Sequence, residues 1–330
     1  MTGPPTRRRG RGGDGAPVVP DATFTSYYGR PVVKAAPWGH DIPAYLFLGG
    51  LAAGSSLLGA GADLTDRPTL RRTGRLGAMV SISLSFVALV HDLGRPGRFA
   101  NMLRVAKPTS PMSVGTWLLT LYGPAAGVAG TAEVARYLPM PDRVRTLLGG
   151  LARPAGIAAA FTAPAVAAYT GVLLGDTATP AWSSARRELP FVFVGSAASA
   201  AGGLGMVGAA FVDAGPARRL AFAGLMGEVV AEQYMERSMG RAVEALRTGR
   251  AGTILRAGKV CTGAGGLTAL AAELFGRRAK RSGQALSAVA GVALMAGSAC
   301  TRFAIFEAGQ ASARDPKYTV VPQRERVDLR

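Results

Sequence analysis

Three long stretches of this sequence contain no charged residue, and they limit what the chain can fold into more than any other feature. They cover residues 112–132, 154–175 and 189–212. A helix needs ~20 predominantly apolar residues to cross the hydrocarbon core of a membrane, and each stretch is long enough. We therefore predict an all-α, polytopic membrane protein.

Five further segments extend this pattern, although the last three of the chain are less apolar. The sequence predicts about eight transmembrane helices arranged as helical bundles, at residues 42–62, 76–93, 112–132, 151–175, 190–212, 217–239, 254–274 and 284–306. The predicted domains are a disordered or interfacial arm (1–37), an eight-helix membrane domain (38–307) and a polar tail (308–330). The membrane domain divides into a first bundle (38–175) and a second bundle (189–307).

The chain is strongly basic, with 38 Lys and Arg against 20 Asp and Glu and a net charge of +18. Such a charge can indicate nucleic-acid binding. Here, however, the basic residues cluster between apolar runs, as at residues 71–75 and 277–281. This distribution is typical of loops at an anionic membrane surface, so we expect a lipid bilayer and no nucleic acid as the partner.

An even number of helices places both termini on the same side of the plasma membrane. The loops on the opposite side hold more Lys and Arg, which favours an extracytoplasmic location for the termini. The basic residues at 7–11 favour the opposite orientation.

Unusual polar and aromatic residues lie at one end of the first four predicted helices. They are Trp38, His40, Asp41 and Tyr45 at the start of the first, His91 and Asp92 at the end of the second, Ser113 and Trp117 at the start of the third, and Tyr169 late in the fourth. Because consecutive helices alternate in direction, all of these residues reach the same membrane face. This face could hold a small molecule that needs hydrogen-bond donors for its polar groups and an apolar or aromatic slot for its ring.

Four motifs at this face resemble a known family. The motifs are HDLGRPGRF at residues 91–99, WGHDIPAY at 38–45, PMSVGTW at 111–117 and YTGVLLG at 169–175. Together they resemble the NrfD/PsrC-like integral membrane subunits of the polysulfide reductase family, over roughly residues 24–300. The resemblance implies a respiratory subunit that passes electrons between menaquinone or ubiquinone and an iron–sulfur partner subunit.

The resemblance also implies roles for individual residues. His40 and Tyr169 match the positions of the family's quinone pocket, with Asp41 adjacent and Trp38 in the same motif. We assign His91 and Asp92 to proton delivery or to support of the pocket. Alternatively, these residues lock the first four helices together through interhelical hydrogen bonds.

The residue counts limit which cofactors this chain can carry. Its only cysteines are Cys261 and Cys300, whereas an iron–sulfur cluster normally takes four ligands. Its only histidines are His40 and His91, and one bis-histidine haem would use both. We therefore predict no haem, no iron–sulfur cluster and no metal in this chain. The resemblance implies a separate catalytic subunit that contains molybdenum or a similar centre.

Two other functions remain open. The chain could be a secondary transporter or proton-translocating protein, in which Glu228, Glu232 and Glu236 share one helix face and form a proton path. It could also be a purely structural anchor whose motifs serve packing and docking. As a member of an oxidoreductase complex, the chain would be a non-catalytic or quinone-reactive subunit rather than a complete enzyme.

Overall fold

The computed structural model describes residues 30–95, 97, 99–135, 137–276 and 280–328. Sequence predictions for the N-terminal arm up to residue 29, and for Arg98 in the HDLGRPGRF motif, lie outside the described residues. Within these ranges all regular elements are helices. They are α1 (Asp41–Leu64), α2 (Pro68–Asp92), α3 (Phe99–Met102), α4 (Pro111–Val134), α5 (Asp142–Gly175), α6 (Pro180–Ser184), α7 (Leu189–Gly208), α8 (Gly215–Ser238), η2 (Gly240–Ala242), α9 (Val243–Arg247), α10 (Gly249–Gly276), α11 (Lys280–Arg314) and α12 (Lys317–Asp328).

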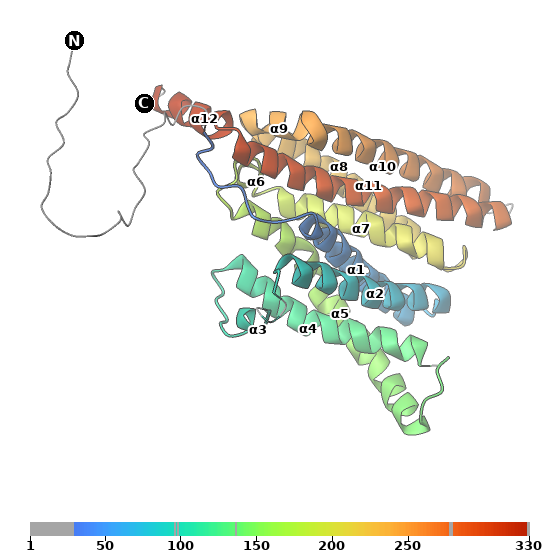
Figure 1. The fold of residues 1–330 in the computed structure, drawn as a ribbon. Coiled ribbons are helices and arrows are strands. Elements are labelled where there is room, and N and C mark those ends of the chain that lie inside the picture. The colour runs from blue at the N-terminus through green and yellow to red at the C-terminus, as the bar shows by residue number, and fades with distance from the viewer. Residues whose placement is uncertain (1–29, 96, 98, 136, 277–279, 329–330) are drawn as a thin grey trace, which may run out of the picture.

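The long helices pack as consecutive pairs along a common direction: α1 with α2, α4 with α5, α7 with α8, and α10 with α11 (Figure 1). Helix α7 lies at the centre, where it contacts α1 and α5 on one side and α11 on the other. Its small residues allow this close packing, since a Cβ on Gly203 would lie 2.6 Å from the carbonyl oxygen of Gly291 in α11. The start of α1 and helix α12 lie at the same end of the bundle (Figure 1).

The protein is an all-α, polytopic membrane protein, as predicted. Five helices of the described chain are long and apolar enough to cross a membrane: α1, α2, α5, α7 and α11. Large apolar side chains such as Phe161 and Leu267 are exposed on the outer surface, as expected for contact with lipid. Helices α4, α8 and α10 are not among the five, so the predicted count of eight spans is not confirmed.

Several helix ends differ from the sequence prediction. Helix α2 begins at Pro68 rather than near residue 76, and α5 begins at Asp142 rather than near residue 151. Helix α11 continues to Arg314, and α12 follows, so that most of the predicted polar tail is helical. The Nζ of Lys317 in α12 donates to Glu244 Oε1 of α9 at 2.9 Å, and this hydrogen bond raises the pKa of Lys317.

Candidate functional site

A cavity of about 430 Å³ lies between α1, α2, α4 and α5, at the end of the bundle where α1 begins. This volume lies within the range of small-molecule sites. The walls are mainly apolar, and the polar or aromatic side chains among them are Trp38, Tyr45, Asp92, Asn101, Thr116 and Tyr169. Segments far apart in the sequence thus meet at the face predicted from the alternating helix directions.

The two tyrosines give the cavity hydrogen-bonding groups that the described protein does not satisfy. Tyr45 and Tyr169 are both buried, the latter with 7% of its surface exposed. Neither hydroxyl has a hydrogen-bond partner in the part of the chain that the structure describes. Both residues line the cavity, so a ligand there could accept hydrogen bonds from these hydroxyls. These hydroxyls are therefore suited to bind a ligand in the cavity.

The Tyr169 ring is positioned by a glycine of the facing helix. A Cβ on Gly115 of α4 would lie 2.8 Å from Cδ2 of this ring, which is closer than two carbon atoms normally approach. The ring therefore packs directly on the α4 backbone. The PMSVGTW motif thus supplies Gly115, whose lack of a side chain makes room for the Tyr169 ring. It also supplies Met112 and Thr116, which line the cavity.

Asp92 links the cavity to the segment before α1. Its Oδ1 accepts a hydrogen bond from the backbone N–H of Gly39 at 3.0 Å, and the side chain lines the cavity. Next to it, His91 Nδ1 lies 2.8 Å from Asp41 Oδ2. The His91 side chain is 78% exposed, so this ion pair contributes little to stability. Both contacts join α1 to the end of α2, and both place ionisable groups beside water.

Trp38 connects the cavity with the second bundle. Its ring stacks on Trp182 of α6, with centroids 5.8 Å apart. The Trp182 indole donates to the carbonyl oxygen of Ile305 in α11 at 2.8 Å. One wall of the cavity is therefore held by a buried aromatic contact between the two halves of the protein.

His40 lies outside the cavity wall. Its Nε2 is 2.9 Å from Glu307 Oε1 at the far end of the sequence, and Arg250 Nη1 lies 3.8 Å from the same oxygen. Asp41 is also outside the wall, where it pairs with His91. The structure thus brings Trp38, Asp92 and Tyr169 together at the cavity, whereas the assignment of His40 and Asp41 to the pocket stays a prediction.

Tyr45 was expected at this face but was not assigned to the pocket. It lies four residues after Asp41, one helical turn into α1, and therefore on the same helix face. The WGHDIPAY motif already included it, so the signal was present in the sequence. Thr116 and Asn101 in the cavity wall were likewise not assigned.

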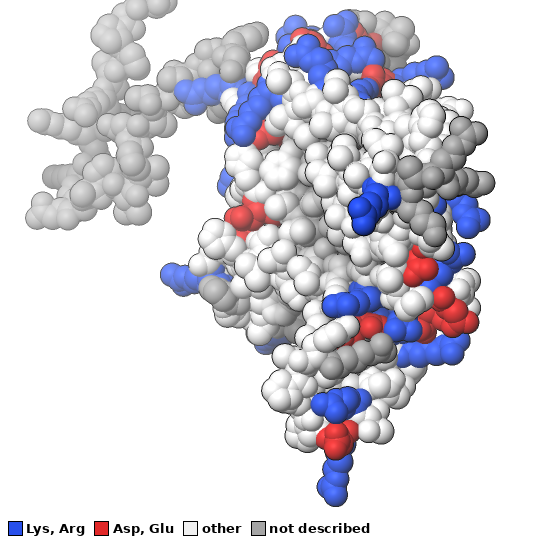
Figure 2. All heavy atoms as spheres, turned by 90° about the vertical axis from the view of Figure 1, so that its right-hand side faces the viewer, with Lys and Arg blue, Asp and Glu red and all other residues white. Residues whose placement is uncertain are grey.

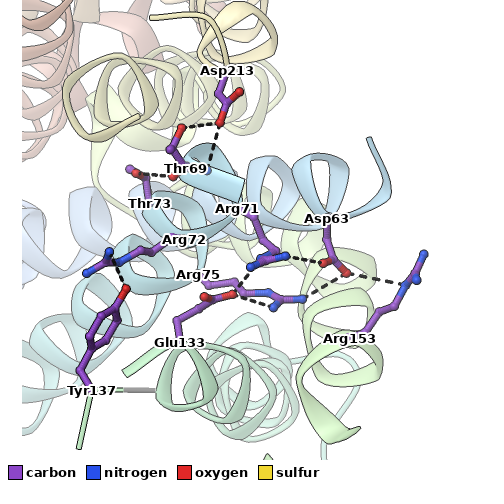
Figure 3. A network of polar contacts seen from close by, with 10 residues as sticks. All are labelled: Asp63, Thr69, Arg71, Arg72, Thr73, Arg75, Glu133, Tyr137, Arg153 and Asp213. Carbon is purple, nitrogen blue, oxygen red and sulfur yellow. Dashed lines mark hydrogen bonds and ion pairs between the residues drawn. The ribbon is translucent and has the colours of Figure 1, made fainter. Parts of the chain in front are cut away.

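The opposite end of the same four helices holds a cluster of charged side chains (Figure 3). Arg75 contacts Glu133 at 2.9 Å and Asp63 at 3.2 Å, and Arg71 Nε also contacts Glu133 at 2.9 Å. Arg153 reaches Asp63 at 3.7 Å. The centre of this ion cluster is buried, with Arg75 5% and Glu133 2% exposed. These groups bind one another, which is the arrangement of a structural network.

A second acidic group lies in the second bundle. Glu228 of α8 is 2% exposed, and its Oε1 accepts a hydrogen bond from Thr301 at 2.9 Å. One and two turns further along α8, Glu232 and Glu236 lie 3.6 Å and 2.8 Å from Lys259 Nζ. A cavity of about 300 Å³ borders all four of these ionisable side chains. On the predicted acidic face of α8, Glu228 is therefore buried inside the protein, whereas Glu232 and Glu236 face Lys259.

The fold is that of a polytopic helical membrane protein with a mainly apolar cavity at one end of its helices. The chain belongs to the NrfD polysulphide reductase family, whose model matches residues 32–226, more than half of the chain. It is thus a membrane subunit of polysulphide-reductase-like, multi-subunit oxidoreductases. No match is found among curated proteins.

The matched region contains α1 to α7 and every residue of the cavity described above. No group of three or more His, Cys, Asp or Glu side chains in the described ranges could hold a metal ion.

Proposed function

We propose that this subunit reacts with quinone in the cavity between α1, α2, α4 and α5, and that it exchanges electrons with an iron–sulfur partner subunit. The observation that carries the proposal is the pair of hydroxyls of Tyr45 and Tyr169, unpartnered within the described chain, in a mainly apolar cavity of about 430 Å³. The matched family supports the same class of function, because its members are subunits of reductases.

The side chains around the cavity fit a quinone head group. The hydroxyls of Tyr45 and Tyr169 can donate hydrogen bonds to its carbonyl oxygens, and the apolar wall and Trp38 can contact its ring. Menaquinone and ubiquinone both have these features, so the proposal covers either. A quinone bound here would accept two electrons and two protons to become a quinol, and a bound quinol would release them.

Asp92 and His91 supply the route for these protons. The carboxyl group of Asp92 borders the cavity, and His91 is exposed to water beside it. Asp92 can therefore exchange a proton with the ligand, and water or the His91–Asp41 pair can restore its protonation state. The backbone N–H of Gly39 positions Asp92 by donating a hydrogen bond to its carboxylate.

The partner subunits follow from the location of the cavity. Electrons must reach the ligand from outside this chain, so we place the iron–sulfur subunit at the end of the bundle where α1 begins, with a molybdenum-type catalytic subunit bound to it. The segment before α1 and helix α12 lie at that end (Figure 1), and the loop charges favour an extracytoplasmic location for it in a plasma membrane. An impermeant thiol reagent should then label a cysteine introduced before residue 30 on intact cells, and no labelling would contradict this orientation.

The activity assay that tests the proposal uses Tyr169→Phe, which removes one hydroxyl and keeps the ring. A hydrogen bond of this kind contributes roughly 1.4 kcal/mol, so quinone affinity should fall about tenfold. Quinol-linked activity is measured against quinone concentration in purified complexes of equal subunit content. Tyr234→Phe, at an exposed tyrosine of α8, is the matched control. An unchanged concentration dependence in Tyr169→Phe would place the pocket elsewhere.

One observation favours proton translocation as a second candidate function. Glu228, Glu232, Lys259 and Glu236 form a series of ionisable groups from the buried interior to the surface. Glu228→Gln should then abolish proton movement in liposomes while leaving quinone affinity unchanged. A structural anchor, the remaining alternative, would bind no quinone and would be unaffected by either substitution.

A further inference from the structure

A separate cavity of about 670 Å³ lies between α8, α10 and α11, at the end of the bundle opposite the quinone cavity. Its walls are apolar and include Phe222 and Leu225 of α8, Leu270 of α10 and Leu294 of α11. Phe222 and Leu270 are largely exposed on the outer surface. A groove with such walls on the side of a membrane protein faces hydrocarbon rather than water.

Two arginines lie at one end of this groove. A Cβ on Gly215, the first residue of α8, would lie 4.0 Å from Nη2 of Arg218 and 3.9 Å from Nη2 of Arg219. Both guanidinium groups are therefore close to the same point of the backbone. Figure 2 looks onto this end of the molecule, where basic side chains are spread over the surface.

The two arginines differ in what they bind. Arg218 Nε donates to Glu273 Oε2 at 2.6 Å, its Nη1 donates to the carbonyl oxygen of Phe211 at 3.0 Å, and its Cζ lies 4.3 Å from the centre of the Phe211 ring. Glu273 thus balances the charge of Arg218. Arg219 is exposed and has no ion pair or hydrogen bond within the described part of the chain. Among the described residues that line the groove, Arg219 is the cation whose charge is available to a ligand.

We propose that this groove binds an anionic phospholipid, with an acyl chain along Phe222, Leu225 and Leu270 and the phosphate on Arg219. A long apolar wall that ends in an uncompensated guanidinium matches a molecule with a long apolar chain and a charged phosphate. Arg218 holds the end of α8 against α10 through Glu273 and so positions Arg219. The site is distinct from the quinone cavity and does not depend on its function.

The test measures lipid binding to the purified full-length chain with and without Arg219→Gln. The wild-type chain should retain phosphatidylglycerol or cardiolipin through purification, and added phosphatidylglycerol should raise its thermal stability more than phosphatidylcholine does. Arg219→Gln should weaken phosphatidylglycerol binding about fivefold, the effect of one basic residue near an anionic lipid surface. Arg143→Gln, at an exposed arginine of α5 on the same side, is the matched control.

Two further arms distinguish the source of the phosphate and the role of the groove. Inorganic phosphate alone should not stabilise the protein, since the proposal requires the acyl chain. Leu270→Trp should reduce retention of phosphatidylglycerol by filling the groove, without any change in charge. Equal lipid binding in the wild type and Arg219→Gln, equal stabilisation by phosphatidylcholine, or full stabilisation by inorganic phosphate would each overturn the proposal.

Discussion

The two ends of α1, α2, α4 and α5 differ in whether their buried polar residues have partners within the protein. At one end, Arg75, Glu133 and Asp63 bind one another in the buried ion cluster (Figure 3). At the other end, the hydroxyls of Tyr45 and Tyr169 line a cavity and have no partner in the described chain. Polar groups that satisfy one another stabilise the fold, whereas polar groups left unpaired around a cavity are available to a ligand. We therefore expect the ion cluster to contribute to stability and the cavity end to contribute to binding.

The largest effect is expected at the ion cluster. Glu133→Ala leaves Arg75 and Arg71 without the carboxylate that both contact, and removal of one partner from a buried ion pair costs about 3–5 kcal/mol. The free energy of unfolding in detergent should fall by this amount. Glu325→Ala, which removes the exposed partner of Arg241, is the control and should cost less than about 1 kcal/mol. A loss at Glu133 no larger than at Glu325 would end the assignment of stability to this cluster.

A somewhat smaller effect is expected at Asp92, and on activity rather than stability. Asp92→Asn keeps an oxygen that can accept from Gly39 but removes the ionisable carboxyl group. General acid–base groups contribute typically about a hundredfold or more to rate, so quinol-linked turnover should fall by roughly that factor and its pH profile should change. The rate is measured across pH in the assembled complex. An unchanged rate and profile would favour the interpretation that Asp92 only locks α1 to α2.

The smallest effect on the free energy of unfolding is expected at Arg153, an exposed member of the ion cluster. Arg153 contacts the same Asp63 as Arg75, but at 3.7 Å and with 64% of its side chain exposed. Exposed pairs contribute about 0.2–1 kcal/mol, so Arg153→Gln should change the free energy of unfolding by no more than that. Arg75→Gln should cost several times as much. Equal losses for the two arginines would show that burial does not determine what these contacts contribute.

The sequence predicted the class of fold and the meeting of four helices at one face. Uncharged segments indicated the membrane helices, and alternating helix directions placed Trp38, Asp92 and Tyr169 together. The beginning of α2 was missed because Arg71, Arg72 and Arg75 were interpreted as a loop. They belong to the helix because Arg71 and Arg75, one turn apart, share a face that contacts Glu133 on α4.

The orientation of individual side chains could not be predicted in the same way. His40 precedes α1 and contacts Glu307 near the end of α11, more than 260 residues later in the sequence. Only the packing of α1 beside α11 creates this contact, and no local pattern encodes it. Tyr45 was present in a motif, but its position in the cavity depends on how α1 packs beside the other helices, including α4 and α5, which meet where the Tyr169 ring lies on Gly115.

The most direct test of the central claim is the Kd of a quinone analogue for the purified chain. It is measured for the wild type, for Tyr45→Phe with Tyr169→Phe, and for Glu133→Ala, each corrected for its folded fraction. The account predicts that loss of the two hydroxyls raises Kd at least about tenfold with little change in the free energy of unfolding, since each hydrogen bond contributes roughly 0.5–1.5 kcal/mol. It predicts that Glu133→Ala lowers the free energy of unfolding and leaves Kd unchanged. An unchanged Kd in the tyrosine variant, or a raised Kd in folded Glu133→Ala, would contradict the account.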